Sequence, residues 1–221
     1  MFRYEKDMIP IIKSFFKERF KQSLSVEELN TGIGIADIVF SKKINKREYY
    51  FNDFELLFHT LTLLNRKNKK ISEFDFVTRF SKRQVNSIID KYISMELIDY
   101  FGSDYFYVKN RLNPTVSEFY AIEAKLKDWK NGFYQALRYK NFAQKTFLAL
   151  SSEYIHRVDK DLFKMNNVGL ISVTKDKASI IINPKKKAPN DRIAYYYLGE
   201  MFTKNIFYNQ KQKEYYPQQW L

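Results

Sequence analysis

The sequence predicts an α/β fold, in which helices flank a mixed central sheet and a small second domain is inserted. Short apolar runs of strand length at 35–40, 118–126 and 145–151 alternate with segments of helical periodicity. Over 51–112 the pattern changes and helical spacing predominates. We therefore expect a core domain made of 1–50 and 113–221, with 51–112 as the insertion.

The first core segment contains a helix and a strand. Apolar residues recur at helical spacing over 3–21, namely Met8, Ile11, Ile12, Phe15, Phe16 and Phe20. Pro10 interrupts this pattern, so the regular helix begins there after an irregular first turn. Gly32 and Gly34 precede the run IADIVF at 35–40, which predicts a strand that follows a turn.

The insertion reads as three helices followed by a hairpin. Helices are predicted over 52–67, where Asn52 or Asp53 is the N-cap, over 71–80 and over 81–98, where Ser81 is the N-cap. Residues 99–108 alternate around Gly102–Ser103, as hairpins do. This order of elements is typical of a winged helix-turn-helix module.

The second core segment resumes the alternation of strands and helices. Strands are predicted over 118–126 and 145–151, and helices over 129–143, where Asp128 is the cap, and over 155–166. The next two apolar segments, 169–176 and 178–184, are predicted to form a hairpin. An aromatic-rich packing helix is expected to follow before the polar C-terminal tail.

Composition and charge restrict the classes of function. The chain has no cysteine and two histidines far apart, His59 and His156, which excludes thiolate zinc sites, cysteine nucleophiles and a histidine metal motif. The net charge of +13 lies mostly outside the nearly neutral insertion and favours nucleic acid as the partner. No apolar run approaches the ~18 residues of a membrane span, so we expect a cytoplasmic protein without a membrane partner.

Two charged residues stand inside an apolar strand. Glu123 and Lys125 share one face of the predicted strand at 118–126, and Asp37 lies on one face of the strand at 35–40. Burying such charges is costly unless they are paired. If the two strands pair with these faces together, Asp37 and Glu123 can share a divalent cation with Lys125 beside it. Oxygen ligands of this kind suit Mg²⁺, for which Mn²⁺ is the expected substitute.

An Asp on one strand and Glu-x-Lys on a neighbouring strand resembles the PD-(D/E)XK, or restriction-endonuclease-like, nuclease superfamily. The matching residues are Asp37 in GIADIVF and Glu123–Ala124–Lys125 in AIEAK. The resemblance covers about 1–50 and 111–184 and implies a metal-dependent nuclease whose metal ligands are Asp37, Glu123 and the carbonyl of Ala124. Ala36 stands where the family often has Pro, and the insertion makes the distance between the motifs unusually long.

Further residues match the same family. Glu5, on the first helix, stands where many members carry an acid that completes the metal site. Gln135 and Tyr139 resemble the Gln-x-x-x-Tyr element of one branch and share a helix face. The resemblance thus implies catalytic roles for Glu5 and Gln135 beside Asp37, Glu123 and Lys125.

Plainer interpretations of these residues stay open. Glu123 and Lys125 could form a surface ion pair on an edge strand, and Asp37 could be a buried acid held by backbone donors. Glu5 is also favoured simply by its place in the first turn of a helix. Gln135 could be a solvated helix residue, and Tyr139 a core aromatic.

Candidate nucleic-acid contacts lie in both domains. Near the predicted site in sequence are Lys127, Lys130, Arg138 and Lys140, which suit phosphate contacts. The third helix of the insertion opens with Lys82, Arg83, Gln84 and Asn86, side chains that can read base edges or phosphates. A solvated helix face would carry the same residue types.

These observations predict a Mg²⁺-dependent endonuclease acting on DNA, most simply on duplex DNA, whose winged-helix insertion helps to recognise DNA or a protein partner. A homodimer would follow if both strands are cut, because each active site severs one strand. One alternative is a catalytically inactive DNA-binding regulator. Another is a subunit of a larger recombination, transposition or defence complex, and RNA as substrate stays open.

Overall fold

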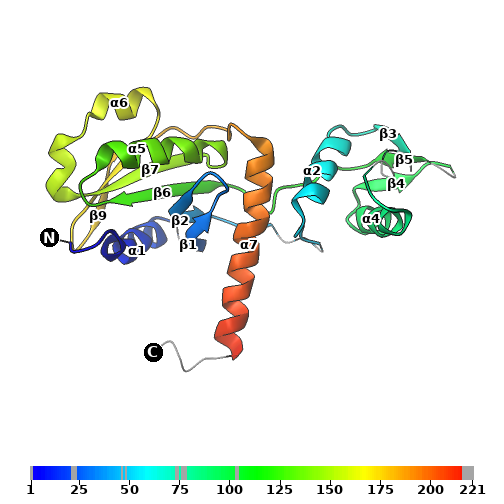
Figure 1. Cartoon of the computed structure of the whole chain (residues 1–221), viewed down its shortest axis with the longest axis horizontal. Coiled ribbons are helices and arrows are strands. Elements are labelled where there is room, and N and C mark those ends of the chain that lie inside the picture. Colours follow the sequence, from blue (N-terminus) through cyan, green and yellow to red (C-terminus); the bar gives the residue numbers. More distant parts are fainter. Residues whose placement is uncertain are drawn as a thin grey trace. The chain divides into compact units, whose positions relative to one another are not determined.

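The computed structural model describes residues 2–20, 24–45, 47, 49–72, 75, 79–102 and 105–215, with side chains as far as 207. The chain forms two compact units: Met1–Ile44 together with Val116–Leu221, and Asn45–Thr115. The first unit contains a six-stranded sheet, and the second contains a three-stranded sheet with helices (Figure 1).

The sheet of the first unit is mixed and has the order β1-β2-β6-β7-β8-β9. Its strands are β1 (Leu24–Asn30), β2 (Ile35–Ser41), β6 (Phe119–Lys125), β7 (Lys145–Ser151), β8 (Gly169–Val173) and β9 (Ala178–Ile182). The central strands β6, β7 and β8 are parallel, and the flanking pairs are antiparallel. This architecture confirms the predicted α/β fold with a mixed central sheet.

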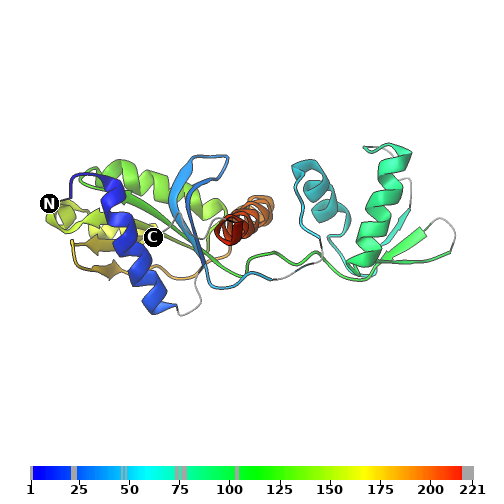
Figure 2. The ribbon, with the colours of Figure 1, turned by 90° about the horizontal axis from the view of Figure 1, so that it is seen from below.

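Helices cover both faces of this sheet. The short 3-10 helix η1 (Glu5–Met8) leads into α1 (Ile9–Arg19), which covers one face. On the other face lie α5 (Trp129–Arg138), α6 (Lys160–Met165) and α7 (Arg192–Tyr215), as Figures 1 and 2 show. Two further 3-10 helices, η2 (Tyr139–Asn141) and η3 (Ser152–Arg157), follow α5 and β7.

Aromatic side chains from distant segments pack between α1 and the sheet. Phe16 of α1 stacks on Phe40 of β2 with ring centroids 4.6 Å apart, and both side chains are buried. Pro10 occupies the first turn of α1, where its missing N–H has no intrahelical partner to lose. The irregular turn that Pro10 predicts is the 3-10 helix η1.

Several boundaries differ from the expected ones. Strand β1 was not predicted, because LSVEELN buries only Val26 and Leu29 and has exposed glutamates between them. The helix expected over 129–143 ends at Arg138 and continues as the 3-10 turn η2. The helix expected over 155–166 is likewise a 3-10 turn until Arg157, and α6 begins only at Lys160, where Asp159 caps it.

The second unit contains α2 (Phe54–Leu63), β3 (Lys70–Ser72), α4 (Lys82–Ser94), β4 (Ile98–Tyr100) and β5 (Tyr105–Val108). Its three strands are antiparallel in the order β3-β5-β4. The helix expected over 71–80 is wrong at 71–72, which belong to β3, and 73–74 and 76–78 lie outside the described residues. Strands β4 and β5 form the predicted hairpin, and Gly102 between them has a φ of +76°; Ser103 lies outside the described residues.

Caps and a buried stripe explain the helices of the second unit. The Asp53 side chain accepts a hydrogen bond of 2.7 Å from the Glu55 amide and so begins α2 as predicted. Ser81 and Gln84 form a capping box at the start of α4. One side of α4 is buried, namely Val85, Ile88, Ile89 and Tyr92.

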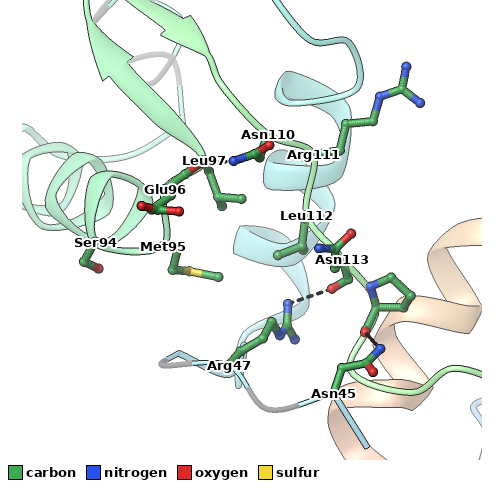
Figure 3. A pocket seen from close by; sticks show the side chains of 11 residues that line it. Asn45, Arg47, Ser94, Met95, Glu96, Leu97, Asn110, Arg111, Leu112 and Asn113 are labelled. Atoms are coloured by element: carbon green, nitrogen blue, oxygen red, sulfur yellow. Dashed lines mark hydrogen bonds between the residues drawn. The ribbon is translucent and has the colours of Figure 1, made fainter.

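A cavity of about 730 Å³ lies within the second unit (Figure 3). The end of α4 and the segment 110–114 form much of its wall. Hydrogen bonds join the segment that enters the unit to the segment that leaves it: Asn45 Nδ2 donates to the Pro114 carbonyl (2.9 Å), and Arg47 Nη1 to the Asn113 carbonyl (3.3 Å). These bonds hold the two connecting segments side by side.

Candidate active site

Asp37 and Glu123 lie where two neighbouring strands part. Strands β2 and β6 pair from Ser41↔Phe119 to Ile38↔Ile122, and the next residues along the ladder are Asp37 and Glu123. The ladder ends there, and Asp37 Oδ2 accepts a hydrogen bond of 2.7 Å from the Ala124 amide in place of a backbone acceptor. Because the N–H and C=O of a strand residue point to the same neighbour, the Ala124 carbonyl also faces β2.

Glu123 is buried and both of its carboxylate oxygens are bonded. Glu123 is 1% exposed. Oε1 accepts from Lys125 Nζ at 2.6 Å, and Oε2 accepts from the Tyr139 hydroxyl at 2.5 Å. The same hydroxyl lies 2.8 Å from the Ile35 carbonyl. Tyr139 is therefore both a core aromatic, packed in the cluster beneath α7, and a direct partner of Glu123.

Helix α5 passes very close to β6 at Lys125. A Cβ atom at Gly132 of α5 would lie 2.8 Å from Lys125 Cγ and 2.5 Å from Leu148 Cδ1. Only glycine leaves room for the aliphatic part of the lysine side chain at this point. Gly132 is thus a positioning residue that was not predicted, although a glycine inside a helical pattern is a recognisable signal.

Glu5 approaches the same group from the first face of the sheet. Its Oε2 lies 3.6 Å from Lys125 Nζ, and its Oε1 accepts from the Leu126 amide at 3.3 Å. The predicted residues Glu5, Asp37, Glu123, Ala124 and Lys125 are therefore brought together in one place.

A cavity of about 410 Å³ opens beside these residues, and Glu5, Asp37 and Ala124 are among the residues that line it. Glu28 of β1 also lines this cavity and lies opposite Asp37 in the ladder that includes Glu27↔Ile38 and Leu29↔Ala36. Its φ of +50° is unusual for a residue other than glycine. The sequence analysis did not predict Glu28 as a site residue, although the acid pair Glu27–Glu28 in LSVEELN is visible in the sequence.

Asp37, which is half-buried, and the buried Glu123 carry more negative charge than the site neutralises. Burial, together with Glu5 and Glu28, raises the pKa of the Asp37 carboxyl, although the Ala124 amide and Lys125 oppose this shift. Burial and the charge of Asp37 likewise raise the pKa of Glu123, against the effects of Lys125 and Tyr139. The charges of Glu5 and Glu28 disfavour the ionisation of Asp37, and the charge of Asp37 disfavours that of Glu123, which indicates a shortage of positive charge.

The ammonium of Lys125 responds in the opposite sense. Burial lowers its pKa, but the hydrogen bond and the charge of Glu123 outweigh burial, so that its pKa lies above the ordinary value. Lys125 is therefore a cation at neutral pH as the site stands.

The donor set fits a hard divalent cation. Two carboxylates and a carbonyl oxygen are the ligands that Mg²⁺ accepts, and it commonly binds one or two carboxylates and completes its shell with water or phosphate. Among the residues that the structure describes, no three His, Cys, Asp or Glu side chains are arranged around one point as metal ligands. The ligands that the sequence predicted for a metal ion are therefore two side chains, Asp37 and Glu123, and one main-chain group, the Ala124 carbonyl.

Gln135 lies on α5 one turn before Tyr139, but it is not hydrogen-bonded to the acids. Its side-chain oxygen is buried and has no hydrogen-bond partner in the described part of the chain. An unpaired buried acceptor costs about 1–3 kcal/mol. The predicted contact of Gln135 with the site therefore remains a prediction.

The predicted phosphate contacts of the first unit lie on α5, in the turn before it and in the turn after it. Lys127, Lys130 and Arg138 are exposed. A Cβ atom at Gly34, in the turn between β1 and β2, would lie 3.6 Å from an Arg138 guanidinium nitrogen. Arg138 therefore extends toward the strand that carries Asp37, whereas Lys140 turns away and donates to the Asn166 carbonyl.

The predicted contacts of the second unit are exposed on the first turns of α4. Lys82, Arg83, Gln84 and Asn86 all lie on its solvent side. Gln84 is already engaged, because its side-chain oxygen accepts from the Ser81 amide (2.9 Å) and hydroxyl (2.7 Å). Its amide N–H groups remain available to a ligand.

No family model matches the chain, and no curated protein matches it. A solved structure that the chain resembles is the SPO1766 protein of unknown function from Silicibacter pomeroyi. The two share 11% sequence identity and a TM-score of 0.50, and the match covers 99% of this chain and 95% of that one. This likeness concerns the fold alone. Within the described residues, no helix combines the length and apolar character needed to cross a membrane.

Proposed function

We propose that the protein is a Mg²⁺-dependent nuclease that hydrolyses phosphodiester bonds in DNA, with a site of the PD-(D/E)XK kind. The observation that carries this proposal is the meeting of Asp37, Glu123 and Lys125 at the point where β2 and β6 separate. The raised pKa values of both acids support it, because a structural ion pair would have no excess of carboxylates.

Each residue has a separate role in this proposal. Asp37, Glu123 and the Ala124 carbonyl would hold the ion. When bound, Mg²⁺ would stabilise charge on the phosphodiester and lower the pKa of a bound water. Lys125 would then exchange its bond to Glu123 for contacts to the phosphate and the attacking water, while Glu5 keeps it in place. Gln135, with its unpaired side-chain oxygen, would accept a hydrogen bond from that water and so orient it, while the proton of the water passes to solvent.

The distribution of charge supports nucleic acid as the substrate. The net charge of +13 favours a polyanion, and Lys127, Lys130 and Arg138, which follow the Glu123–Lys125 segment in the sequence, are exposed. We further propose that the second unit is a winged-helix module, because α4 is followed by the β4–β5 hairpin. In this proposal Lys82, Arg83 and Asn86 contact DNA or a protein partner. Because the second unit is nearly neutral, it would add to binding by the first unit and would not bind DNA by itself.

Cleavage of plasmid DNA tests the proposal. Purified protein with Mg²⁺ or Mn²⁺ should nick or linearise the plasmid, and the substitutions Asp37→Ala and Lys125→Ala should each abolish cleavage. Asp161 and Lys164 form an exposed ion pair of 2.9 Å elsewhere on the first unit. Asp161→Ala and Lys164→Ala are therefore controls of matched chemistry that should leave cleavage intact.

The products separate the remaining alternatives. Linear plasmid without a nicked intermediate would indicate that two sites act together, as in a homodimer. Binding of Mg²⁺ without cleavage would favour a subunit that needs partners, and DNA binding without any Mg²⁺ affinity would favour an inactive regulator. Cleavage that survives both Asp37→Ala and Lys125→Ala would show that the site is wrongly assigned.

A further inference from the structure

A small polar cavity of about 100 Å³ lies within the first unit and is lined by residues outside the candidate active site. Residues from η2, the start of β7 and the segment 187–190 form its wall, including Lys140, Gln144, Thr146, Asn167 and Lys187. This volume is about three times the ~30 Å³ that a water molecule occupies in the liquid. The cavity can therefore hold a few waters or one group of the size of a phosphate.

The hydroxyl of Thr146 is an unsatisfied group in this wall. Thr146 is 1% exposed, and its Oγ1 is buried without a hydrogen-bond partner. Such a group is costly to leave unpaired, so a buried hydroxyl is normally bonded to protein, water or a ligand. Because it donates one hydrogen bond, it is well suited to an anionic oxygen.

Two lysines supply positive charge to the same cavity. Burial lowers the pKa of Lys140, and the charge of Lys187 lowers it further, so the two ammonium groups lie close enough to repel each other. Lys140 is anchored by its bond to the Asn166 carbonyl. The ammonium of Lys187 has no hydrogen bond or ion pair within the described residues, and no carboxylate lines the cavity.

Backbone hydrogen bonds hold the walls together. The Lys187 amide donates to the Gln144 carbonyl at 3.1 Å, and the Asn190 amide donates to the Lys140 carbonyl at 3.0 Å. The Asn167 side chain bonds both the amide and the carbonyl of Lys185, at 2.7 and 2.9 Å. The cavity is therefore formed by fixed backbone rather than by loosely placed side chains.

We propose that this cavity binds a phosphate group, which Lys187 and Lys140 hold by charge and Thr146 by a hydrogen bond. Both lysines are cationic donors and the hydroxyl is a neutral donor, a combination that recognises a tetrahedral oxyanion. The inference does not depend on nuclease activity. The phosphate can be a free anion or the terminal phosphate of a nucleic-acid strand, and binding experiments separate these two sources.

The position of the cavity places it near the candidate active site. Thr146 pairs with Ala121 of β6, which lies two residues before Glu123, or about 7 Å along the strand. Lys140 follows Tyr139, whose hydroxyl bonds Glu123. A terminal phosphate held in the cavity would thus lie on the same face of the sheet as Glu123.

Calorimetric titration with inorganic phosphate, in phosphate-free buffer with chelator, tests this proposal. We expect saturable binding that Lys187→Ala and Thr146→Val each weaken by about tenfold, the effect of losing one charge-assisted hydrogen bond. Lys185→Ala removes the same charge from the same lysine run outside the wall, and should not change the affinity. Thr203→Val removes another buried, unpaired hydroxyl outside the wall and is the matched control for Thr146→Val.

A second titration uses a short DNA strand with and without a 5′-phosphate. Tighter binding of the phosphorylated strand, lost in Lys187→Ala, would identify the terminal phosphate as the ligand, whereas binding of inorganic phosphate alone would identify a free anion. Absence of saturable binding by both probes, as expected if water alone fills the cavity, would overturn the proposal. Equal phosphate affinity in the cavity variants and their controls would overturn it as well. The thermal stability of each variant shows whether that variant is folded.

Discussion

The two ends of strand β6 each carry a buried glutamate, and the two glutamates lie in opposite electrostatic environments. Glu118, immediately before the strand, is 8% exposed and accepts from Lys186 Nζ at 3.1 Å and the Tyr120 hydroxyl at 2.8 Å, with Lys42 3.6 Å away. Burial raises the pKa of Glu118, but Tyr120, Lys186 and Lys42 outweigh it and hold the pKa below its ordinary value.

Glu123, near the other end of the same strand, has one cation and a second acid beside it. Burial and Asp37 raise its pKa above the ordinary value despite the bond to Lys125. Burial alone therefore does not distinguish a structural acid from a candidate metal ligand. The local balance of charge does, because an acid that lacks sufficient cations is costly to keep unless a ligand completes the site.

The exchange of each glutamate for glutamine is expected to give the largest contrast. Glu123→Gln should reduce cleavage by more than about a hundredfold, the upper end of the loss caused by removing an outer partner of a metal site, without loss of stability. Glu118→Gln should leave cleavage intact and lower the melting temperature by about 2–6 °C, because it unpairs Lys186 and Lys42. Plasmid cleavage and thermal unfolding of both variants check this, and equal behaviour of the two would refute the comparison.

The close contact of Gly132 with Lys125 provides a steric test. Gly132→Ala adds a methyl group 2.5 Å from Leu148 and 2.8 Å from Lys125, and overpacking of this kind costs about 1–3 kcal/mol. Because the lysine side chain must also shift, cleavage should fall more than stability predicts. Asn131→Ala on the exposed side of α5 is the control, and denaturant unfolding measured beside cleavage rates separates the two effects. Normal stability and normal cleavage in Gly132→Ala would contradict the close packing of α5 on β6.

Tyrosines next to each glutamate allow a finer comparison. Tyr139→Phe removes the hydrogen bond to Glu123 and should lower the cleavage rate by about tenfold, as expected for a positioning residue. It should also raise the Mg²⁺ concentration needed for half-maximal activity. Tyr120→Phe removes the corresponding bond to Glu118 and should affect stability only. A loss of activity in Tyr120→Phe equal to that in Tyr139→Phe would remove the distinction between the two ends.

Acid should affect the two ends with opposite signs. The lowered pKa of Glu118 stabilises the fold above the ordinary value of 4.5, and this contribution is lost as the pH falls through the lower folded pKa. The raised pKa values of Asp37 and Glu123 instead destabilise the fold as the pH rises through the window above 3.8 and 4.5. Asp37→Asn should thus be more stable than the unsubstituted protein at neutral pH.

Urea unfolding at a series of pH values measures this effect. The stability advantage of Asp37→Asn should disappear at low pH, where the native carboxyl is already protonated, and the deficit of Glu118→Gln should disappear there too. Persistence of either difference in acid would mean that the ionisation of that carboxyl is not its cause.

The sequence predicted the strands of the sheet centre better than its edges. Strands β2, β6 and β7 are apolar on both faces, and such runs are readable without tertiary information. The edge strand β1 was missed because Glu27 and Glu28 interrupt its apolar pattern. Strand β3 was missed because only Ile71 of its three residues is buried. A strand this short shows no alternation of apolar and polar residues that could be detected in the sequence.

The candidate site shows a similar limit. Asp37, Glu123 and Lys125 were found because charges in apolar strands are conspicuous. Glu28 and Gly132 each leave a signal in the sequence, an acid pair and a glycine within a helical pattern, but neither signal shows that the residue lies beside Asp37 or Lys125. The left-handed backbone of Glu28 and the 2.8 Å approach of Gly132 to Lys125 exist only in the folded chain.

Calorimetric titration with Mg²⁺ at neutral pH tests the central claim most directly, using the unsubstituted protein, Asp37→Asn and Glu118→Gln. Asp37 and Glu123 have too few cations beside them, whereas Glu118 has enough. Mg²⁺ should therefore bind the unsubstituted protein and Glu118→Gln with the same affinity. Asp37→Asn should show no specific binding. Equal Mg²⁺ affinity in all three proteins, or none in the unsubstituted protein, would contradict a metal site at Asp37 and Glu123.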